Sequence, residues 1–94
     1  MKKVINLSTA CLNGSHLQGR IVADVSDLVE LFGSPFMPPR GEKVTMEWSL
    51  LFVDDETGET IPATIYDWKR TPGWSVGGYD HRAVEIVQQF IRGF

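Results

Sequence analysis

Residues 43–53, KVTMEWSLLFV, decide the fold, because apolar and polar side chains alternate along them. A period of two residues is typical of a β-strand with one buried face. Thr45, Glu47 and Ser49 lie on the polar face. The apolar face, which we expect to be covered, carries Val44, Met46, Trp48, Leu50 and Phe52.

A second strand is predicted at Ile61–Trp68, after the polar turn DDETGE. Pro62 has no N–H to donate, so this strand is either at a sheet edge there or begins to pair after it. We expect the two strands to form an antiparallel hairpin. Its second strand places Ile61, Ala63 and Ile65 on one face and Thr60, Thr64, Tyr66 and Trp68 on the other.

Two helices are predicted. The first spans 25–32, since Asp24 or Ser26 can cap it and Gly33 can end it before Pro35. The last spans 80–92, with Asp80 as its N-cap. Apolar residues recur at helical spacing along both: Val25, Leu28, Val29 and Phe32 in the first, and Ala83, Val84, Ile86, Val87, Phe90 and Ile91 in the last.

The remaining segments complete the predicted fold. Lys3–Leu7 and His16–Ala23 are expected to pair as a hairpin around Asn13-Gly14. Ser34–Glu42 is predicted to be a proline-rich loop that holds Arg40 in place. The prediction is therefore a single α+β domain over residues 1–94. Its antiparallel sheet would have three or four strands, with two helices and the C-terminal helix packed on one face.

Composition narrows the class of protein. The chain is 43% hydrophobic and 22% charged, with a net charge of -3. General nucleic-acid binders are usually basic, so that function is disfavoured. Cys11 is the only cysteine, which indicates a reducing cytoplasm. No apolar run is long enough to cross a membrane. The N-terminal apolar stretch is interrupted by Asn6, Ser8 and Thr9, so we interpret it as structure and not as a targeting segment.

Residues 60–82, TIPATIYDWKRTPGWSVGGYDHR, contain the candidate ligand site. Aromatic rings can stack on a base, cations can bind phosphates, and glycines let the backbone approach a ligand. The N–H groups at the start of the last helix attract anions. The predicted ligand-binding residues are Trp68, Lys69, Arg70, Trp74, Gly77, Gly78, Tyr79, His81 and Arg82, with Arg40 as a further cation. The alternative is a long hairpin-to-helix loop whose tryptophans pack beneath it as a satellite core.

No catalytic or metal site is predicted. The spacing of Asp54, Asp55, Glu56 and Glu59 does not match a calcium loop, and a solvated turn explains these residues. His16, His81 and Cys11 are too few for a zinc site. We therefore expect no cofactor and no enzyme activity, with a nucleotide hydrolase or lyase as the remaining catalytic alternative.

The polar face of the first predicted strand also bears apolar residues. Leu51 and Val53 share it with Tyr66 and Trp68 of the second strand. Exposed apolar patches tend to become interfaces, so we expect a homo-oligomer.

Four motifs resemble a pattern in small accessory proteins of bacteriophages. They are FGSP (32–35), KVTMEWSLLF (43–52), TIYDWK (64–69) and WSVGG (74–78), and they span about the last two-thirds of the chain. The resemblance implies a viral setting and so the host cytoplasm. Some such proteins counter bacterial defence by sequestering nucleotide signals or by binding a defence complex.

Two functions follow as expectations. In the first, the protein sequesters a small nucleotide-like signal without catalysis, using the residues named above. In the second, it is a protein–protein inhibitor or adaptor that binds a host defence complex through its strand face and the acidic hairpin tip.

Overall fold

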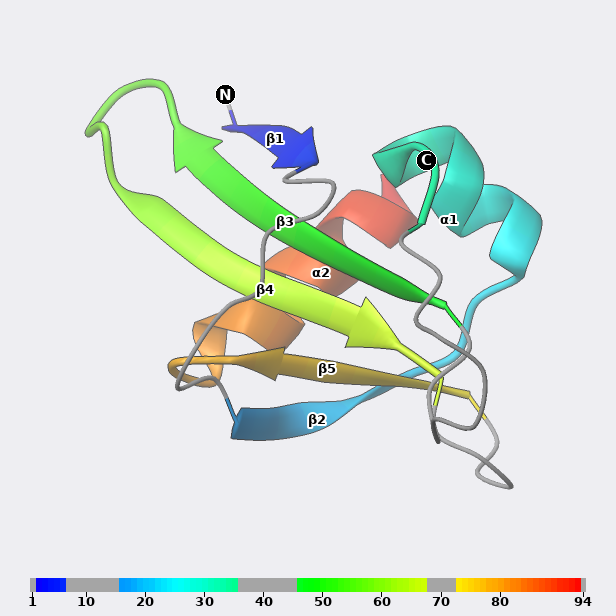
Figure 1. The fold of residues 1–94 in the computed structure, drawn as a ribbon. Helices are drawn as coiled ribbons and strands as arrows, with labels where there is room; N and C mark the ends of the chain where they lie inside the picture. The colour runs from blue at the N-terminus through cyan, green and yellow to red at the C-terminus, as the bar shows by residue number, and fades with distance from the viewer. Residues whose placement is uncertain (1, 7–15, 36–45, 68–72, 94) are drawn as a thin grey trace.

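Five antiparallel strands form one sheet in the order β1-β3-β4-β5-β2, and both helices lie on the same side of it (Figure 1). The computed structural model describes residues 2–6, 16–35, 46–67 and 73–93. The elements are β1 Lys2–Asn6, β2 His16–Ile21, α1 Val25–Phe32, β3 Glu47–Asp54, β4 Thr60–Tyr66, β5 Trp74–Gly78 and α2 Arg82–Arg92. The α+β class is confirmed, with one strand more than predicted.

The predicted central hairpin is confirmed. β3 pairs with β4 in a register that sets Trp48 opposite Ile65 and Phe52 opposite Ile61. These four side chains are buried on the face that carries the helices. The ladder between β4 and β5 begins at Ala63, directly after Pro62, so the missing N–H lies beyond the end of that pairing.

The predicted N-terminal hairpin is wrong. β1 pairs with β3 and β2 pairs with β5, so the two strands lie at opposite edges of the sheet. Each edge strand places an apolar residue at the core: Val4 lies opposite Phe52, and Ile21 is buried. Burial against the central strands outweighs the local turn signal at Asn13-Gly14, which lies outside the described residues.

The stretch predicted as a loop before the last helix contains a strand, β5, between β4 and β2. Its sequence WSVGG has weak strand propensity because glycine is depleted in strands. Ladders on both sides stabilise β5, and these contacts come from distant parts of the chain.

Helix α1 matches its predicted bounds, and two tryptophans of the sheet bind its ends. The indole N–H of Trp74 donates to the carbonyl of Ala23 at 2.9 Å, and that of Trp48 donates to the carbonyl of Gly33 at 2.8 Å. The two indole rings meet edge to face at 5.4 Å. Gly33 has a φ of 86°, which favours glycine after the helix.

Helix α2 begins at Arg82, two residues after the predicted bound, and its N-cap is His81 and not Asp80. The Asp80 carboxylate still accepts the backbone N–H of Arg82 at 2.8 Å. The helix lies close to the sheet because Gly78 of β5, which faces Ala83, has no side chain. A Cβ added at Gly78 would lie 2.6 Å from that of Ala83. Phe90 of α2 then meets Phe52 at 4.8 Å between ring centres.

Replacing Trp48 with Ala should destabilise the protein by about 3–5 kcal/mol, because the indole is 1% exposed and its loss leaves a cavity. Trp48→Phe keeps most of the apolar contact and loses the hydrogen bond to Gly33, so it should cost less. Chemical denaturation followed by circular dichroism measures both. A Trp48→Ala variant that unfolds at the parent's midpoint would contradict this description of the core.

Candidate functional site

The structure describes six of the ten predicted ligand-binding residues: Trp74, Gly77, Gly78, Tyr79, His81 and Arg82. Arg40, Trp68, Lys69 and Arg70 lie outside the described residues. The six do not converge on one surface. Trp74 and Gly78 face the helices, whereas Gly77 faces the opposite way, and Tyr79, His81 and Arg82 are exposed around the start of α2.

Trp74 already has a structural role. Its indole donates to Ala23 and packs against Trp48, which fixes the ring next to α1. The alternative expected tryptophans to pack beneath a loop; Trp74 packs against the core from a strand, and Trp68 lies outside the described residues. Tyr79, 52% exposed, remains accessible for contact with a ligand.

Gly77 and Gly78 belong to β5, which is paired with a strand on each side. Because side chains alternate along a strand, the two glycines leave space on opposite faces of the sheet. Gly78 makes room for Ala83 of α2. On the other face, a Cβ at Gly77 would lie 2.6 Å from Oγ1 of Thr64 and 3.6 Å from Cε1 of Tyr66. The Tyr66 ring therefore extends over Gly77.

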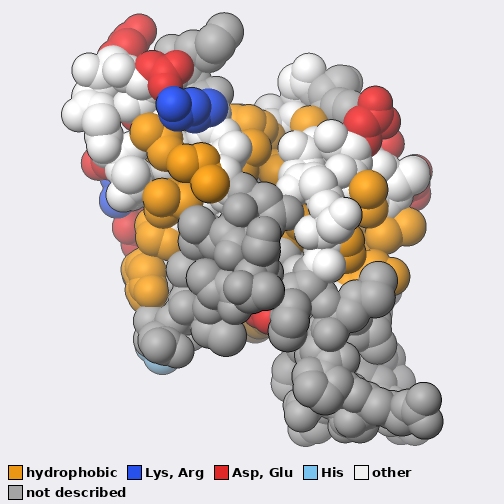
Figure 2. All heavy atoms as spheres, turned by 45° about the horizontal axis from the view of Figure 1, so that its top comes forward, with side chains coloured by type: hydrophobic (Ala, Val, Ile, Leu, Met, Phe, Trp, Pro, Cys, Tyr) orange, Lys and Arg blue, Asp and Glu red, His pale blue; other side chains and the backbone are white. Residues whose placement is uncertain are grey.

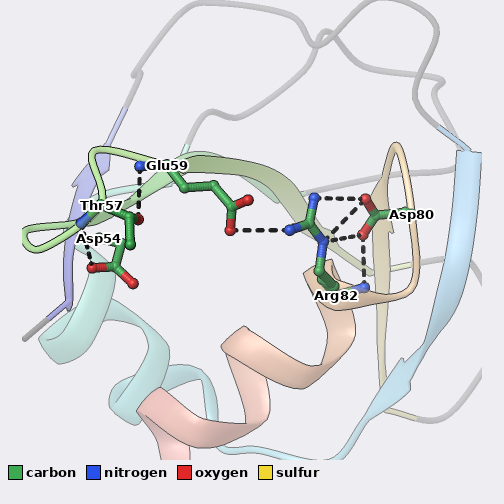
Figure 3. A network of polar contacts seen from close by, with 5 residues as sticks. All are labelled: Asp54, Thr57, Glu59, Asp80 and Arg82. Carbon is green, nitrogen blue, oxygen red and sulfur yellow. Dashed lines mark hydrogen bonds and ion pairs between the residues drawn. The ribbon is translucent and has the colours of Figure 1, made fainter.

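Arg82 is held by two carboxylates of the protein itself (Figure 3). Its guanidinium lies 3.0 Å from Oε1 of Glu59 and 3.1 Å from Oδ2 of Asp80. Hydrogen bonds from Arg82 lower the pKa of Asp80, and those carboxylates raise the pKa of Arg82. The cation at the start of α2 is thus compensated without an external anion.

The β3–β4 turn is the acidic tip, defined as residues 54–59. Asp54 accepts the backbone N–H groups of Glu56 and Thr57, and Gly58 has a φ of 76°. Asp55 and Glu56 are exposed. Acidic side chains gather at this end of the molecule, with hydrophobic ones on the neighbouring surface (Figure 2).

The sheet face opposite the helices, here called the outer face, carries a row of four polar or charged side chains. Glu47 lies opposite Tyr66, Tyr66 opposite Ser75, and Ser75 opposite Arg20, so the row crosses β3, β4, β5 and β2. Neighbouring strands are about 4.8 Å apart, so the row is about 14 Å long at the backbone. Leu17, Arg20, Tyr66 and Ser75 line a pocket at one end of it.

The charges of this row differ from those around Arg82. Burial raises the pKa of Glu47, and burial together with the Glu47 charge raises the pKa of Tyr66. The Tyr66 phenol therefore stays protonated at neutral pH and can donate a hydrogen bond. Arg20 is a cation at the far end of the row and lowers the pKa of Tyr66 in part.

A second polar row runs beside the first, with Ser49 of β3 opposite Thr64 of β4. Ser49, Thr64 and Ser75 are buried, so the outer face is less solvated than the alternating pattern predicted. Leu51, Val53 and Tyr66 are only partly buried, so the apolar patch predicted on this face is partly accessible over these residues.

Sequence reasoning named none of the four residues of the row as a ligand contact: Glu47, Tyr66, Ser75 and Arg20. The strand periodicity of 16–23 offered a signal for Arg20. Its place beside Ser75 and Tyr66 depends on β2 pairing with β5, which no local pattern indicates.

Comparison with protein-family models, with curated proteins and with solved structures finds no match. The resemblance to phage accessory proteins therefore stays a prediction. Over the described ranges, no helix has the length and apolar character needed to cross a membrane. Nor do the described His, Cys, Asp and Glu residues form a group of three or more that could hold a metal ion.

The Arg82 contacts predict a pH dependence. A carboxyl with a lowered pKa stabilises the fold above its ordinary pKa of 3.8, and this contribution disappears as the pH falls through the lowered value. Arg82→Gln should therefore melt below the parent at pH 7, and the gap should close below pH 3.8. Thermal melts from neutral to strongly acidic pH measure this. A gap that is independent of pH would show that the ion pairs contribute nothing.

Proposed function

We propose that this protein is a non-catalytic binding protein that sequesters a small anionic, nucleotide-like ligand on its outer face, in the setting of phage counter-defence. One observation carries the proposal. Glu47, Tyr66, Ser75 and Arg20 lie in register across four strands, next to a pocket that three of them line with Leu17.

The chemistry of the row suits such a ligand. A base stacked on an aromatic ring gains about 1–3 kcal/mol. Arg20 supplies a charge-assisted contact to phosphate, and the hydroxyl of Ser75 lies between Arg20 and Tyr66 in the row. Trp68, Lys69 and Arg70 follow Tyr66 closely in the sequence and remain proposed ligand contacts.

The proposal puts the phosphate near Arg20 and not near Arg82. Asp80 and Glu59 already compensate Arg82, and a phosphate there would have to displace carboxylates of equal sign.

Arg20→Glu should weaken binding of a phosphate-bearing nucleotide by about 10- to 100-fold, because an attractive contact becomes a repulsive one. Mass spectrometry of a native preparation and a thermal-shift panel of linear and cyclic nucleotides would select the ligand, and calorimetry would measure its affinity. Bound ligand at 100 times its dissociation constant stabilises the fold by about 2.7 kcal/mol.

Arg92→Glu is the matched control, since it makes the same charge change on an exposed residue of α2. It should bind like the parent. Equal affinities for the Arg20 and Arg92 variants would remove the outer-face site.

A second candidate is a protein–protein inhibitor or adaptor that binds a host defence complex. It is supported by the exposed carboxylates Asp55 and Glu56 at the acidic tip, beside the mixed patch of the outer face. Under this alternative, Asp55→Asn with Glu56→Gln would abolish inhibition in a phage-defence assay, whereas Arg20→Glu would leave it intact. The opposite pattern would support sequestration.

The homo-oligomer also remains a proposal. Ile5 is 44% exposed on the outer face next to the half-buried Leu51, which makes this end of the sheet apolar. Light scattering should give a mass well above the 10.6 kDa of one chain. A mass of one chain at micromolar concentration would contradict assembly through this patch.

A further inference from the structure

Glu47 is a carboxylate that the fold leaves without a partner among the described residues. It is partly buried on the outer face, where burial raises its pKa, and no described side chain forms a hydrogen bond or an ion pair with it. A half-buried charge without a partner is unfavourable unless a partner arrives. Two other described carboxylates, Asp80 and Glu59, are already paired with Arg82.

Its neighbours define what such a partner would be. Glu47 is directly opposite Tyr66, on the side away from Ser75 and Arg20. Directly opposed side chains have Cβ atoms about 4.5–5.5 Å apart. A flat ring on Tyr66 would thus turn one edge toward Glu47 and its opposite end toward Ser75 and Arg20.

We propose that Glu47 determines base specificity and that the ligand carries guanine. This inference rests on the proposed function. A carboxylate accepts two parallel hydrogen bonds, as it does from arginine. Guanine offers two adjacent donors, N1–H and the 2-amino group, on one edge. Adenine and cytosine offer an amino group beside a ring nitrogen that is an acceptor, which would repel the second carboxylate oxygen.

The order of the row agrees with the shape of a guanine nucleotide. The base lies on Tyr66 with its donor edge at Glu47, and the phosphate lies toward Ser75 and Arg20. Glu47 and Arg20 lie at the two ends of a row about 14 Å long at the backbone. The cation Arg20 would therefore lie at the phosphate end of the ligand, and the carboxylate of Glu47 would lie at the edge of the base that carries the hydrogen-bond donors.

Calorimetry with guanosine, inosine and adenosine monophosphates tests the inference. Inosine monophosphate differs from the guanine nucleotide only by lacking the 2-amino group. The parent should bind the guanine nucleotide about 10- to 100-fold more tightly than either of the others, the worth of one or two charge-assisted hydrogen bonds. This comparison needs no variant and so does not depend on how a variant folds.

Glu47→Gln removes one acceptor at constant size and should reduce the preference to less than about 3-fold while adenosine monophosphate binds as before. Glu85→Gln, on the exposed side of α2, is the control and should keep the preference. Guanine and inosine nucleotides of equal affinity, or a preference that survives Glu47→Gln, would overturn the role of Glu47.

Failure of the proposed function gives a different result. If the parent binds none of the three nucleotides, or binds them regardless of Arg20→Glu, the outer-face site itself is wrong. Binding that depends on Arg20 but does not distinguish the bases leaves the function standing and removes only the guanine assignment.

Discussion

Two indole hydrogen bonds tie the helical layer to the sheet. Trp48 on β3 and Trp74 on β5 bind the carbonyls at the two ends of α1, and their rings meet edge to face between them. Each indole N–H thus has a partner, and the carbonyls of Ala23 and Gly33, which flank the helix, each accept one of these hydrogen bonds. With α1 fixed, Phe32 reaches Phe52 and the core closes on one face of the sheet.

The helices cover one face of the sheet, so the polar row lies on the outer face. Two adjacent glycines in β5 allow close packing on both faces of the sheet. Gly78 lets Ala83 of α2 approach the backbone, and Gly77 leaves space beside Thr64 over which Tyr66 extends. A larger side chain at either position would push apart neighbouring elements. The glycine pair that first indicated a phosphate cradle therefore has a packing role on one face and bears on the candidate site through the other.

The two polar regions differ in how their charged side chains are arranged. Around Arg82, two carboxylates of the protein satisfy the cation and join α2 to the β3–β4 hairpin (Figure 3). Such exposed pairs contribute little to stability and are screened by salt. In the outer-face row, Glu47 and Arg20 are separated by the two strands β4 and β5, and Arg20 lines a pocket together with Tyr66 and Ser75. A small number of polar groups at fixed positions beside a pocket is typical of a site that recognises a small molecule.

Elements whose signals are local could be predicted from the amino-acid sequence. Alternation gave the β3–β4 hairpin and its buried face, and helical spacing between Asp24 and Gly33 gave α1 with its bounds. Only the tertiary structure decided that β1 and β2 separate to opposite edges, that WSVGG is a strand, and that Arg20 stands beside Tyr66. Periodicity follows from the geometry of one segment, whereas the partner of a strand is chosen by burial against residues far away in the chain.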